Sequence, residues 1–392
     1  MKNLIEKYSN KLVAQGVCDA NEPLLGGLDS EIIWNKSSNK IKELKIVTQE
    51  LNINSILFSK PAEPYLSIIN FLTENLLTTD NAIFPEDCET RTFLHDIPVI
   101  AEFNSQQIVT ALKKRKAVII NDKGIVTFGI VSPEQAFISY CSVCFACFVK
   151  FFTDYYYNSK AGIENYHQKS IIIKSIQIYN EFLTNYKNPI PLSNGPFLNK
   201  EDIIKGIIHA GKLVVDYRLV DSFFGNISFR LDNTILISQT TSSLDELAGN
   251  IDPCPMDNSS CVAITASSEL SAHKDIYIKS DKKAILHGHP KFSVIMSMLC
   301  DFNHCTTKGN CHLKCPEKRF IGDIPIVPGE VGTGTYGLSK TLPPAMQNRR
   351  GAIVYGHGVF TVGQHDFTDA FFNLLDIEKM CMKEYLTVIK IL

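Results

Sequence analysis

The spacing of hydrophobic residues divides the chain into interspersed helices and strands. Residues 199–217 carry Ile, Leu and Val among charged residues, which predicts an amphipathic helix. Residues 226–231 and 234–238 alternate on either side of Asp232-Asn233, which predicts a β-hairpin. The same patterns predict strands at 284–289, 324–327, 352–354 and 359–362, and helices at 133–157, 162–185, 268–278, 291–299, 339–349 and 368–391. Interspersed helices and frequent hairpins favour a mainly antiparallel sheet covered by helices, an α/β layered fold.

Two stretches of the chain resemble each other. Residues 93–99 (FLHDIPV) match residues 320–326 (FIGDIPI), and residues 111–120 resemble residues 345–354. Both stretches continue without a gap into a similar motif, KGIVTFG at 123–129 and HGVFTVG at 357–363. A long apolar helix is predicted after each motif. The copies lie about 230 residues apart, which is too long for a solenoid repeat. The pattern indicates a duplicated domain; the alternative is a chance likeness between two strand–turn–strand–helix units.

A proline-rich segment separates the two halves. Residues 188–196 (NPIPLSNGP) hold three prolines and one glycine, which end a helix and are typical of a linker. The total of 392 residues also favours two or three domains. We therefore expect one domain at 1–195, including a connecting helix, and a second at 196–392.

Composition excludes several classes of protein. Hydrophobic residues make up 45% of the chain and charged residues 20%, which excludes a disordered, collagen-like or coiled-coil chain. The net charge of −2 provides no basic field for nucleic acid or an anionic membrane. The most apolar run, 136–152, is too short for a membrane span and contains Lys150, so it predicts a buried helix. The first residues predict an amphipathic helix and no signal peptide, which favours a cytoplasmic location with reduced thiols.

Three histidines and a glutamate have the pattern of a metal site. His287 and His289 lie two residues apart on a predicted strand, so their side chains point to the same face. His357 ends another apolar strand between two glycines, and Glu269 opens a predicted helix. Imidazoles grouped in this way suit Zn²⁺ or a similar divalent ion. The alternative is a set of ordinary buried histidines.

A second group of residues has the chemistry of an anion site. Its members are small amide and hydroxyl residues in loops or at the start of a helix: Gly225, Asn226, Thr240, Thr241, Ser267 and Ser268. Backbone N–H groups at a helix N-terminus favour a phosphate or carboxylate. The alternative is that these residues are caps and turns.

Taken together, these motifs resemble the class II aldolase/adducin family of the fuculose-phosphate-aldolase type. The resemblance covers about 198–392 and rests on GNISFR, ISQTT, SSELSAH, HGHP, GTG and GHG, which occur in the family's order. It implies a three-layer αβα sandwich and a ring of four subunits. It also implies zinc ligands at His287, His289 and His357, with Glu269 as ligand or base. His273 would be a positioning or structural residue. The small polar residues above would hold the substrate phosphate.

The resemblance also implies a function. We expect a zinc-dependent lyase that makes or breaks a C–C bond through a metal-stabilised enediolate, on a small polyhydroxylated, phosphorylated carbonyl substrate. Decarboxylase, dehydratase or epimerase activity of the same family is the alternative, and an adducin-like binding or scaffold protein is a second one. Thr241 departs from the family, which has glycine there, and Glu269 stands where family epimerases commonly have aspartate. Residues 250–260 predict a loop that shapes specificity.

The first half resembles the family only in part. Lys123 stands where His357 stands in the second half, and residues 84–87 are the expected counterpart of 286–289. A protonated lysine cannot bind Zn²⁺, so the first half is predicted to be a metal-free pseudo-domain. Such a domain could replace a neighbouring subunit, giving a homo-oligomer that is a dimer of double domains or a tetramer.

The 12 cysteines are more than a cytosolic enzyme usually has. Four of them, Cys300, Cys305, Cys311 and Cys315, cluster within 16 residues, which suggests a second zinc or an iron–sulfur cluster. The alternative is a set of reduced thiols, because the spacing is not that of paired C-x2-C motifs. Another three cysteines lie on the apolar run and predict core packing: Cys141, Cys144 and Cys147.

Overall fold

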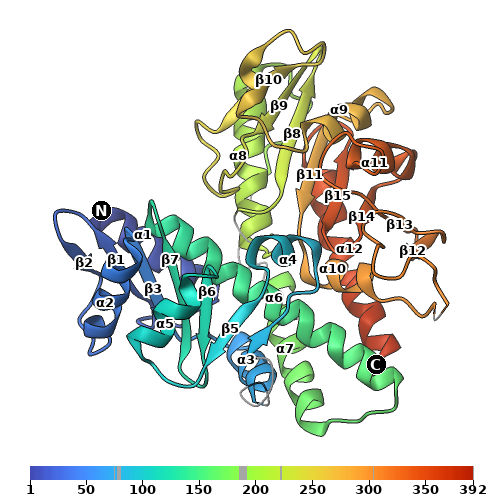
Figure 1. Ribbon diagram of the computed structural model, residues 1–392. Coiled ribbons are helices and arrows are strands. Elements are labelled where there is room, and N and C mark those ends of the chain that lie inside the picture. The colour runs from blue at the N-terminus through green and yellow to red at the C-terminus, as the bar shows by residue number, and fades with distance from the viewer. Residues whose placement is uncertain (75, 77–80, 185–191, 221–222, 303, 392) are drawn as a thin grey trace. The chain divides into compact units, whose positions relative to one another are not determined.

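The computed structural model of the protein describes residues 1–74, 76, 81–184, 192–220, 223–302 and 304–391. The chain folds into two compact units, Met1–Asn180 and Glu181–Leu392. Each unit is built on its own sheet, blue to cyan in the first and yellow to red in the second (Figure 1). Part of the linker predicted at 188–196, residues 188–191, lies outside the described residues.

The second unit is built on an eight-stranded sheet in the order β10-β9-β8-β11-β15-β14-β13-β12. Neighbouring strands are antiparallel except β13 and β14, which are parallel. The mainly antiparallel sheet expected from the sequence is therefore confirmed. Its strands are β8 (Asn226–Leu231), β9 (Thr234–Ser238), β10 (Ile251–Pro255), β11 (Ala284–Gly288), β12 (Arg319–Ile321), β13 (Ile324–Val327), β14 (Gly351–Val354) and β15 (Gly358–Gly363).

Helices cover both faces of this sheet, which confirms the expected three layers. Alternate strand residues point to opposite faces. In β15, Phe360 and Val362 join the core under α9 and α11, whereas the Thr361 hydroxyl donates to the Ala370 carbonyl of α12. The first layer consists of α9 (Leu270–Ile278) and α11 (Leu338–Met346), and the opposite layer of α8 (Lys200–Asp216), α10 (Lys291–Met298) and α12 (Thr368–Val388).

One segment of this unit differs from the prediction. The sequence predicts a loop at 250–260, but Ile251–Pro255 form β10 and pair with β9 at the edge of the sheet. Prolines lack a donor N–H, and an edge strand needs partners on one side only, so Pro253 and Pro255 are tolerated there. The strand was not predicted because its two prolines are typical of a loop.

The first unit has a seven-stranded sheet in the order β2-β1-β3-β7-β6-β5-β4. Its strands are β1 (Leu24–Leu28), β2 (Ile32–Trp34), β3 (Ser55–Ser59), β4 (Ala82–Ile83), β5 (Ile97–Ile100), β6 (Ala117–Ile120) and β7 (Gly124–Gly129). Its helices are α1 (Lys2–Ala14), α2 (Ile41–Leu51), α3 (Tyr65–Thr73), α4 (Cys88–Leu94), α5 (Ser105–Leu112), α6 (Pro133–Lys160) and α7 (Tyr166–Thr184). Helices α2 and α5 share one core cluster with the sheet, as α9 and α11 do in the second unit.

The two sheets have the same connectivity, which confirms the duplication. Strands β1, β2, β3, β4, β5, β6 and β7 correspond in sheet position and pairing direction to β8, β9, β11, β12, β13, β14 and β15. The shared threonine of the repeat has the same role in both units. Thr127 donates to the Ala136 carbonyl of α6, as Thr361 does to that of Ala370 in α12.

Helix α6 is long and apolar enough to cross a membrane by length and composition, but 89% of its most apolar window is buried inside the structure. Its cysteines at 141, 144 and 147 are all buried, which confirms their predicted packing role. Burial raises the pKa of the Cys147 thiol to about 12, so this group stays protonated. The helix is thus a core element of the first unit.

A buried carboxylate fixes the helix that follows the His287 strand. Glu378 of α12 is fully buried and accepts hydrogen bonds from the Phe292 and Ser293 amides and from the Ser293 hydroxyl. Negative charge at a helix N-terminus is stabilising, and both carboxylate oxygens face donors. A glutamine would place an NH₂ group against one of them.

We expect Glu378→Gln to lower the free energy of unfolding by about 2–4 kcal/mol, because one buried donor loses its acceptor. Urea denaturation followed by circular dichroism measures this change. Glu384→Gln, an exposed change on the same helix, is the matched control and should stay within about 0.5 kcal/mol of wild type. Equal stability of the two variants would contradict the role of Glu378.

Candidate metal centre

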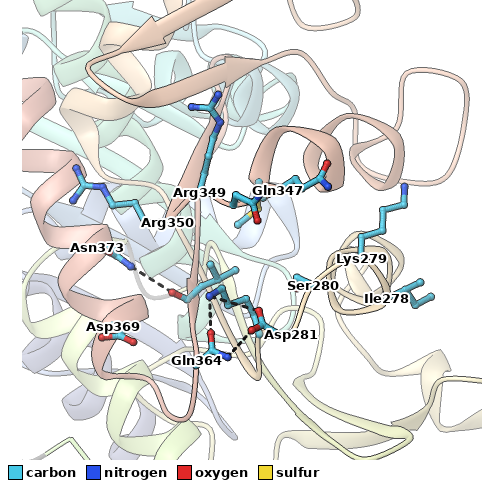
Figure 2. A pocket seen from close by; sticks show the side chains of 14 residues that line it. Ile278, Lys279, Ser280, Asp281, Gln347, Arg349, Arg350, Gln364, Asp369 and Asn373 are labelled. Carbon is cyan, nitrogen blue, oxygen red and sulfur yellow. Dashed lines mark hydrogen bonds and ion pairs between the residues drawn. The ribbon is translucent and has the colours of Figure 1, made fainter.

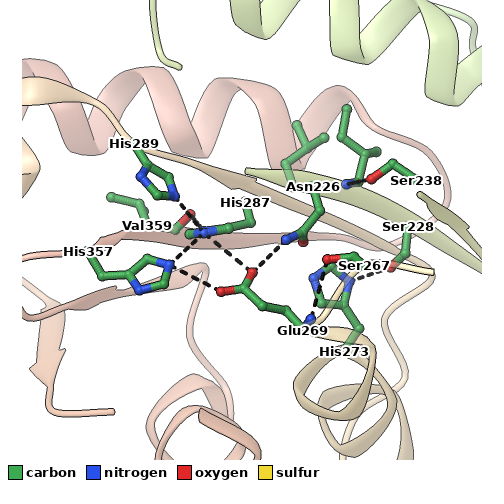
Figure 3. A network of polar contacts seen from close by, with 12 residues as sticks. Asn226, Ser228, Ser238, Ser267, Glu269, His273, His287, His289, His357 and Val359 are labelled. Atoms are coloured by element: carbon green, nitrogen blue, oxygen red, sulfur yellow. Dashed lines mark hydrogen bonds and ion pairs between the residues drawn. The ribbon is translucent and has the colours of Figure 1, made fainter. Parts of the chain in front are cut away.

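Three buried histidines converge in the second unit. His287 lies on β11, His289 directly follows that strand, and His357 lies in the turn between β14 and β15. Their ligand nitrogens all lie within 4.8 Å of one another. His287 Nε2 is 3.0 Å from His289 Nε2 and 3.2 Å from His357 Nε2 (Figure 3). A tetrahedral zinc with Zn–N bonds of about 2.0–2.1 Å separates neighbouring ligands by about 3.3 Å, so the group fits such an ion.

The backbone around the histidines orients their rings. His287 Nδ1 lies 3.0 Å from the Val359 carbonyl, which can only accept, so Nδ1 carries the proton and Nε2 is left for a metal. The His287 ring also stacks on Phe360, with ring centroids 3.9 Å apart. A Cβ atom at Gly358 would lie 2.8 Å from His287 Cε1 and 2.9 Å from His289 Cδ2. The glycine after His357 therefore leaves room for the other two rings.

Glu269 adds a carboxylate to the group. Its Oε1 lies 3.1 Å from His357 Nε2 and its Oε2 lies 3.4 Å from His287 Nε2. The Asn226 amide donates to Oε2 at 2.5 Å. Burial by itself would raise the pKa of Glu269, but the contacts with His287, His357 and Asn226 outweigh it and hold that pKa well below its usual range. The group is an anion that can join a metal or move a proton beside it.

Burial favours the neutral form of two of the three imidazoles. It lowers the pKa of His287 to about 4 and holds the pKa of His289 well below its usual value. A neutral imidazole is the form that binds a metal. The site thus presents the neutral imidazoles of His287 and His289, the His357 ring and one carboxylate.

His273 stands behind this group. Its Nδ1 lies 2.6 Å from the Ser228 hydroxyl, which is 2.8 Å from the Tyr277 hydroxyl (Figure 3). His273 is fully buried one turn after Glu269 on α9, and burial lowers its pKa to about 3. It connects α9 to β8 and lies outside the convergent histidine group, in keeping with a positioning role.

The corresponding positions of the first unit cannot hold a metal. In the pairing of β3 with β7, Phe58 takes the place of His287, Lys60 that of His289 and Lys123 that of His357. The expected counterpart at 84–87 is wrong, because those residues follow β4 at the other edge of the sheet. The likeness of residues 84–87 to 286–289 did not predict the position in the sheet, because long-range strand pairing decides that position.

Glu269 has a counterpart of opposite charge. Lys40 precedes α2 as Glu269 precedes α9, and its amide donates to Ser38 Oγ at 3.3 Å, as that of Glu269 does to Ser267 Oγ. The Lys40 ammonium lies 4.9 Å from the centre of the Phe58 ring, a cation–π contact. A lysine and a phenyl ring therefore stand where the second unit has a carboxylate and an imidazole.

The predicted anion-binding residues separate into two sets. Thr240, Ser267 and Ser268 line a cavity of about 700 Å³. Thr241, beside it in sequence, is exposed and has φ +60°, a conformation that favours the family's glycine.

Gly225 and Asn226 lie instead beside His287 and Glu269. A Cβ at Gly225, which has φ +86°, would lie 2.3 Å from the His287 carbonyl oxygen. The glycine thus permits close approach to β11, and Asn226 contacts Glu269. The Oδ1 atom of Asn226 is buried without a hydrogen-bond partner among the described residues.

The same cavity contains residues that the sequence analysis missed. Lys274 of α9 and Ser339 and Lys340 of α11 line it, together with Thr333. The glycine-rich segment 332–337 before α11 was a signal that could have found them. The packing of α9 against α11 was not visible in the sequence.

The four clustered cysteines are not brought together. Across the described part of the chain, the three histidines are the only set of three or more His, Cys, Asp or Glu ligands that converges. Cys305 Sγ contacts the Thr307 hydroxyl at 3.2 Å, and all four thiols are free. A second metal at Cys300, Cys305, Cys311 and Cys315 gains no support from the fold.

A larger cavity, of about 980 Å³, lies where β11 begins and β15 ends (Figure 2). Lys282 donates to the Gln364 side chain at 2.6 Å, and Gln364 donates to Asp281 at 2.8 Å. None of the histidine ligands lines this cavity. Three of its polar residues, Asp281, Lys282 and Gln364, pair with one another.

The fold and site define a three-layer α/β domain with a triple-histidine centre. Residues 205–385 match the family described as Class II Aldolase and Adducin N-terminal domain. The second half of the chain is therefore a class II aldolase/adducin domain.

Solved structures similar to this half share little sequence with it. L-fuculose-1-phosphate aldolase from Thermus thermophilus is 18% identical, with a TM-score of 0.37, over 49% of this chain and 94% of that one. A sugar-phosphate aldolase from Thermotoga maritima is 20% identical, with a TM-score of 0.37, over 49% and 96%. YgbL from Klebsiella pneumoniae, a putative aldolase/epimerase/decarboxylase, is 18% identical, with a TM-score of 0.38, over 46% and 87%. Among curated proteins, none matches the chain in sequence.

We expect the full chain to bind about one zinc ion, because only the second unit has ligands. His287→Ala and His357→Ala should each weaken zinc binding by at least about 100-fold. Competition with a chromogenic chelator measures the affinity, and elemental analysis measures the ratio. His209→Ala, an exposed histidine of α8, is the control and should bind like wild type. Two ions per chain, or full binding by both site variants, would contradict the assignment.

Proposed function

We propose that the protein is a zinc-dependent lyase of the aldolase type, acting on a small polyhydroxylated, phosphorylated carbonyl compound. The observation that carries this proposal is the position of Glu269, within 3.1–3.4 Å of two histidine ligands. The preceding residues, Ser267 and Ser268, line the hydroxyl-rich cavity. We place the substrate phosphate in that cavity and the reacting carbonyl at the histidine group.

Different residues would bind the metal, transfer the proton and bind the phosphate in such a reaction. A divalent ion held by His287, His289 and His357 would supply a Lewis acid that polarises substrate oxygens. Glu269 can accept a proton from a substrate hydroxyl or carbon and return it. Asn226 holds one carboxylate oxygen, and its own unpartnered Oδ1 can accept from a substrate hydroxyl. Thr240, Ser267 and Ser268 supply donors for a phosphate.

Close alternatives share this chemistry. A decarboxylase, dehydratase or epimerase would use the same metal and carboxylate, and the neighbours include a putative aldolase/epimerase/decarboxylase. An adducin-like scaffold would not need the ligands, all of which are present here. Incubation of the zinc-loaded protein with ketose phosphates, followed by NMR of the products, distinguishes cleavage from loss of carbon dioxide, loss of water and inversion at a carbon.

We further propose that the first unit takes the place of a neighbouring subunit in a dimer of double domains, with the protein located in the cytoplasm. The shared connectivity of the sheets and the lysines at the ligand positions support a unit that keeps the fold without the metal. The described cysteines form no disulfides, in keeping with a reducing compartment. Sedimentation equilibrium of the full chain tests the assembly, and a stable active monomer would overturn it.

We expect Glu269→Gln to lower kcat by about 10²–10⁴-fold while zinc remains bound, because the amide cannot accept a proton and the three histidines are intact. Turnover of the best ketose phosphate and the zinc ratio are measured on the same sample. Glu384→Gln, far along the chain and exposed, should match wild type in both. Full activity of Glu269→Gln would reject the proton-transfer role.

A further inference from the structure

The hydroxyl-rich cavity is larger than a single phosphate requires. Its volume is about 700 Å³, and two helices of the same layer, α9 and α11, contribute to its lining. Thr240, Ser267 and Ser268 lie at the α9 end, beside Glu269. Ser339 and Lys340 line it from the first turn of α11. The two sets of residues come from different elements, and we call the parts of the cavity that they line the α9 end and the α11 end.

Each end coincides with the start of a helix of nine residues. The helix dipole adds partial positive charge at each start. Several of the first N–H groups already have acceptors, since Leu270 donates to Ser267, Leu338 to Glu330 and Lys340 to Gly337, so the side chains have to supply the donors. Two lysines, Lys274 and Lys340, and one carboxylate, Asp275, are the charged residues of the lining. The balance of charge therefore favours an anion.

An unpartnered side chain marks the α11 end. Ser339 is 2% exposed, and its hydroxyl has no hydrogen-bond partner among the described residues. A buried hydroxyl left without a partner costs free energy, so its presence at a cavity wall points to a ligand. By contrast, the Lys274 ammonium already donates to Asn258 Oδ1 at 3.1 Å. Ser339 and Lys340 are thus the groups most available for binding.

We infer that this end of the cavity is a second anion subsite, so that the substrate carries two anionic groups. The first group binds at Thr240, Ser267 and Ser268, and the second, a phosphate or a carboxylate, binds at Ser339 and Lys340. This inference rests on the proposed function for the first subsite only. It narrows the substrate class to a carbonyl compound with an anionic group at each end.

The test uses non-reacting probes and the full zinc-loaded chain. Isothermal titration calorimetry at fixed low ionic strength gives Kd for 1,4-butanediol monophosphate, 1,4-butanediol bisphosphate and the phosphate ester of 4-hydroxybutyrate. We expect at least one doubly anionic probe to bind about 10-fold or more tightly than the monophosphate, because charge-assisted hydrogen bonds form at the second end. Which of the two probes gains affinity identifies a phosphate or a carboxylate as the second group.

Variants show which residues provide the tighter binding of the doubly anionic probe. Ser339→Ala combined with Lys340→Gln should remove the preference and leave the monophosphate Kd unchanged, whereas Ser268→Ala should weaken all three probes. Lys279→Gln removes an exposed positive charge outside this cavity and should keep the preference. Equal affinities in the wild type, or a preference that survives the double variant or is lost in Lys279→Gln, would overturn the inference.

The result that would contradict the proposed function differs from the one that would contradict the second anion subsite. No turnover of any ketose phosphate would count against the lyase while leaving the probe affinities intact. Equal probe affinities alongside turnover would remove the second subsite and keep the lyase.

Discussion

The antiparallel pairing of β11 with β8 and β15 is the constraint on which the site depends. It places His287 opposite Asn226 on one side and opposite Phe360 on the other. The same pairing brings the Val359 carbonyl to His287 Nδ1 and so decides which ring nitrogen faces the metal position. A slip of one residue would turn His287 to the other face of the sheet, away from Glu269. Strand register therefore fixes the face on which His287 lies, and the segments that follow β11 and β14 add His289 and His357.

The first unit shows that the same register can exist without the chemistry. Phe58 occupies the position of His287 and is 5% exposed, so it fills a packing space rather than a ligand shell. Lys40 lies over that ring where the second unit has Glu269. Replacing an imidazole and a carboxylate by a phenyl ring and an ammonium keeps a favourable contact and reverses the charge. The first unit thus keeps the fold through packing, without a group of described residues that could hold a metal.

Much of the second unit could be predicted because its signals are local. The hairpin across Asp232-Asn233 and the strand before His287 follow from alternation over a few residues. That His287 and His289 point to the same face follows from the period of two in a strand. By contrast, β10 was missed because prolines disguise an edge strand, and the counterpart of His287 was misplaced because motif likeness says nothing about sheet order.

The sequence by itself determined the layered α/β class, the duplication and the three histidines that converge, because each rests on periodicity or on residue types that few other roles require. The tertiary structure decided how those residues act together. It alone brought Glu269 to the histidines, turned Asn226 toward that carboxylate, and placed Ser339 and Lys340 at the cavity that Ser267 lines. These contacts join residues 18 or more positions apart, where the determinant is how helices and strands pack.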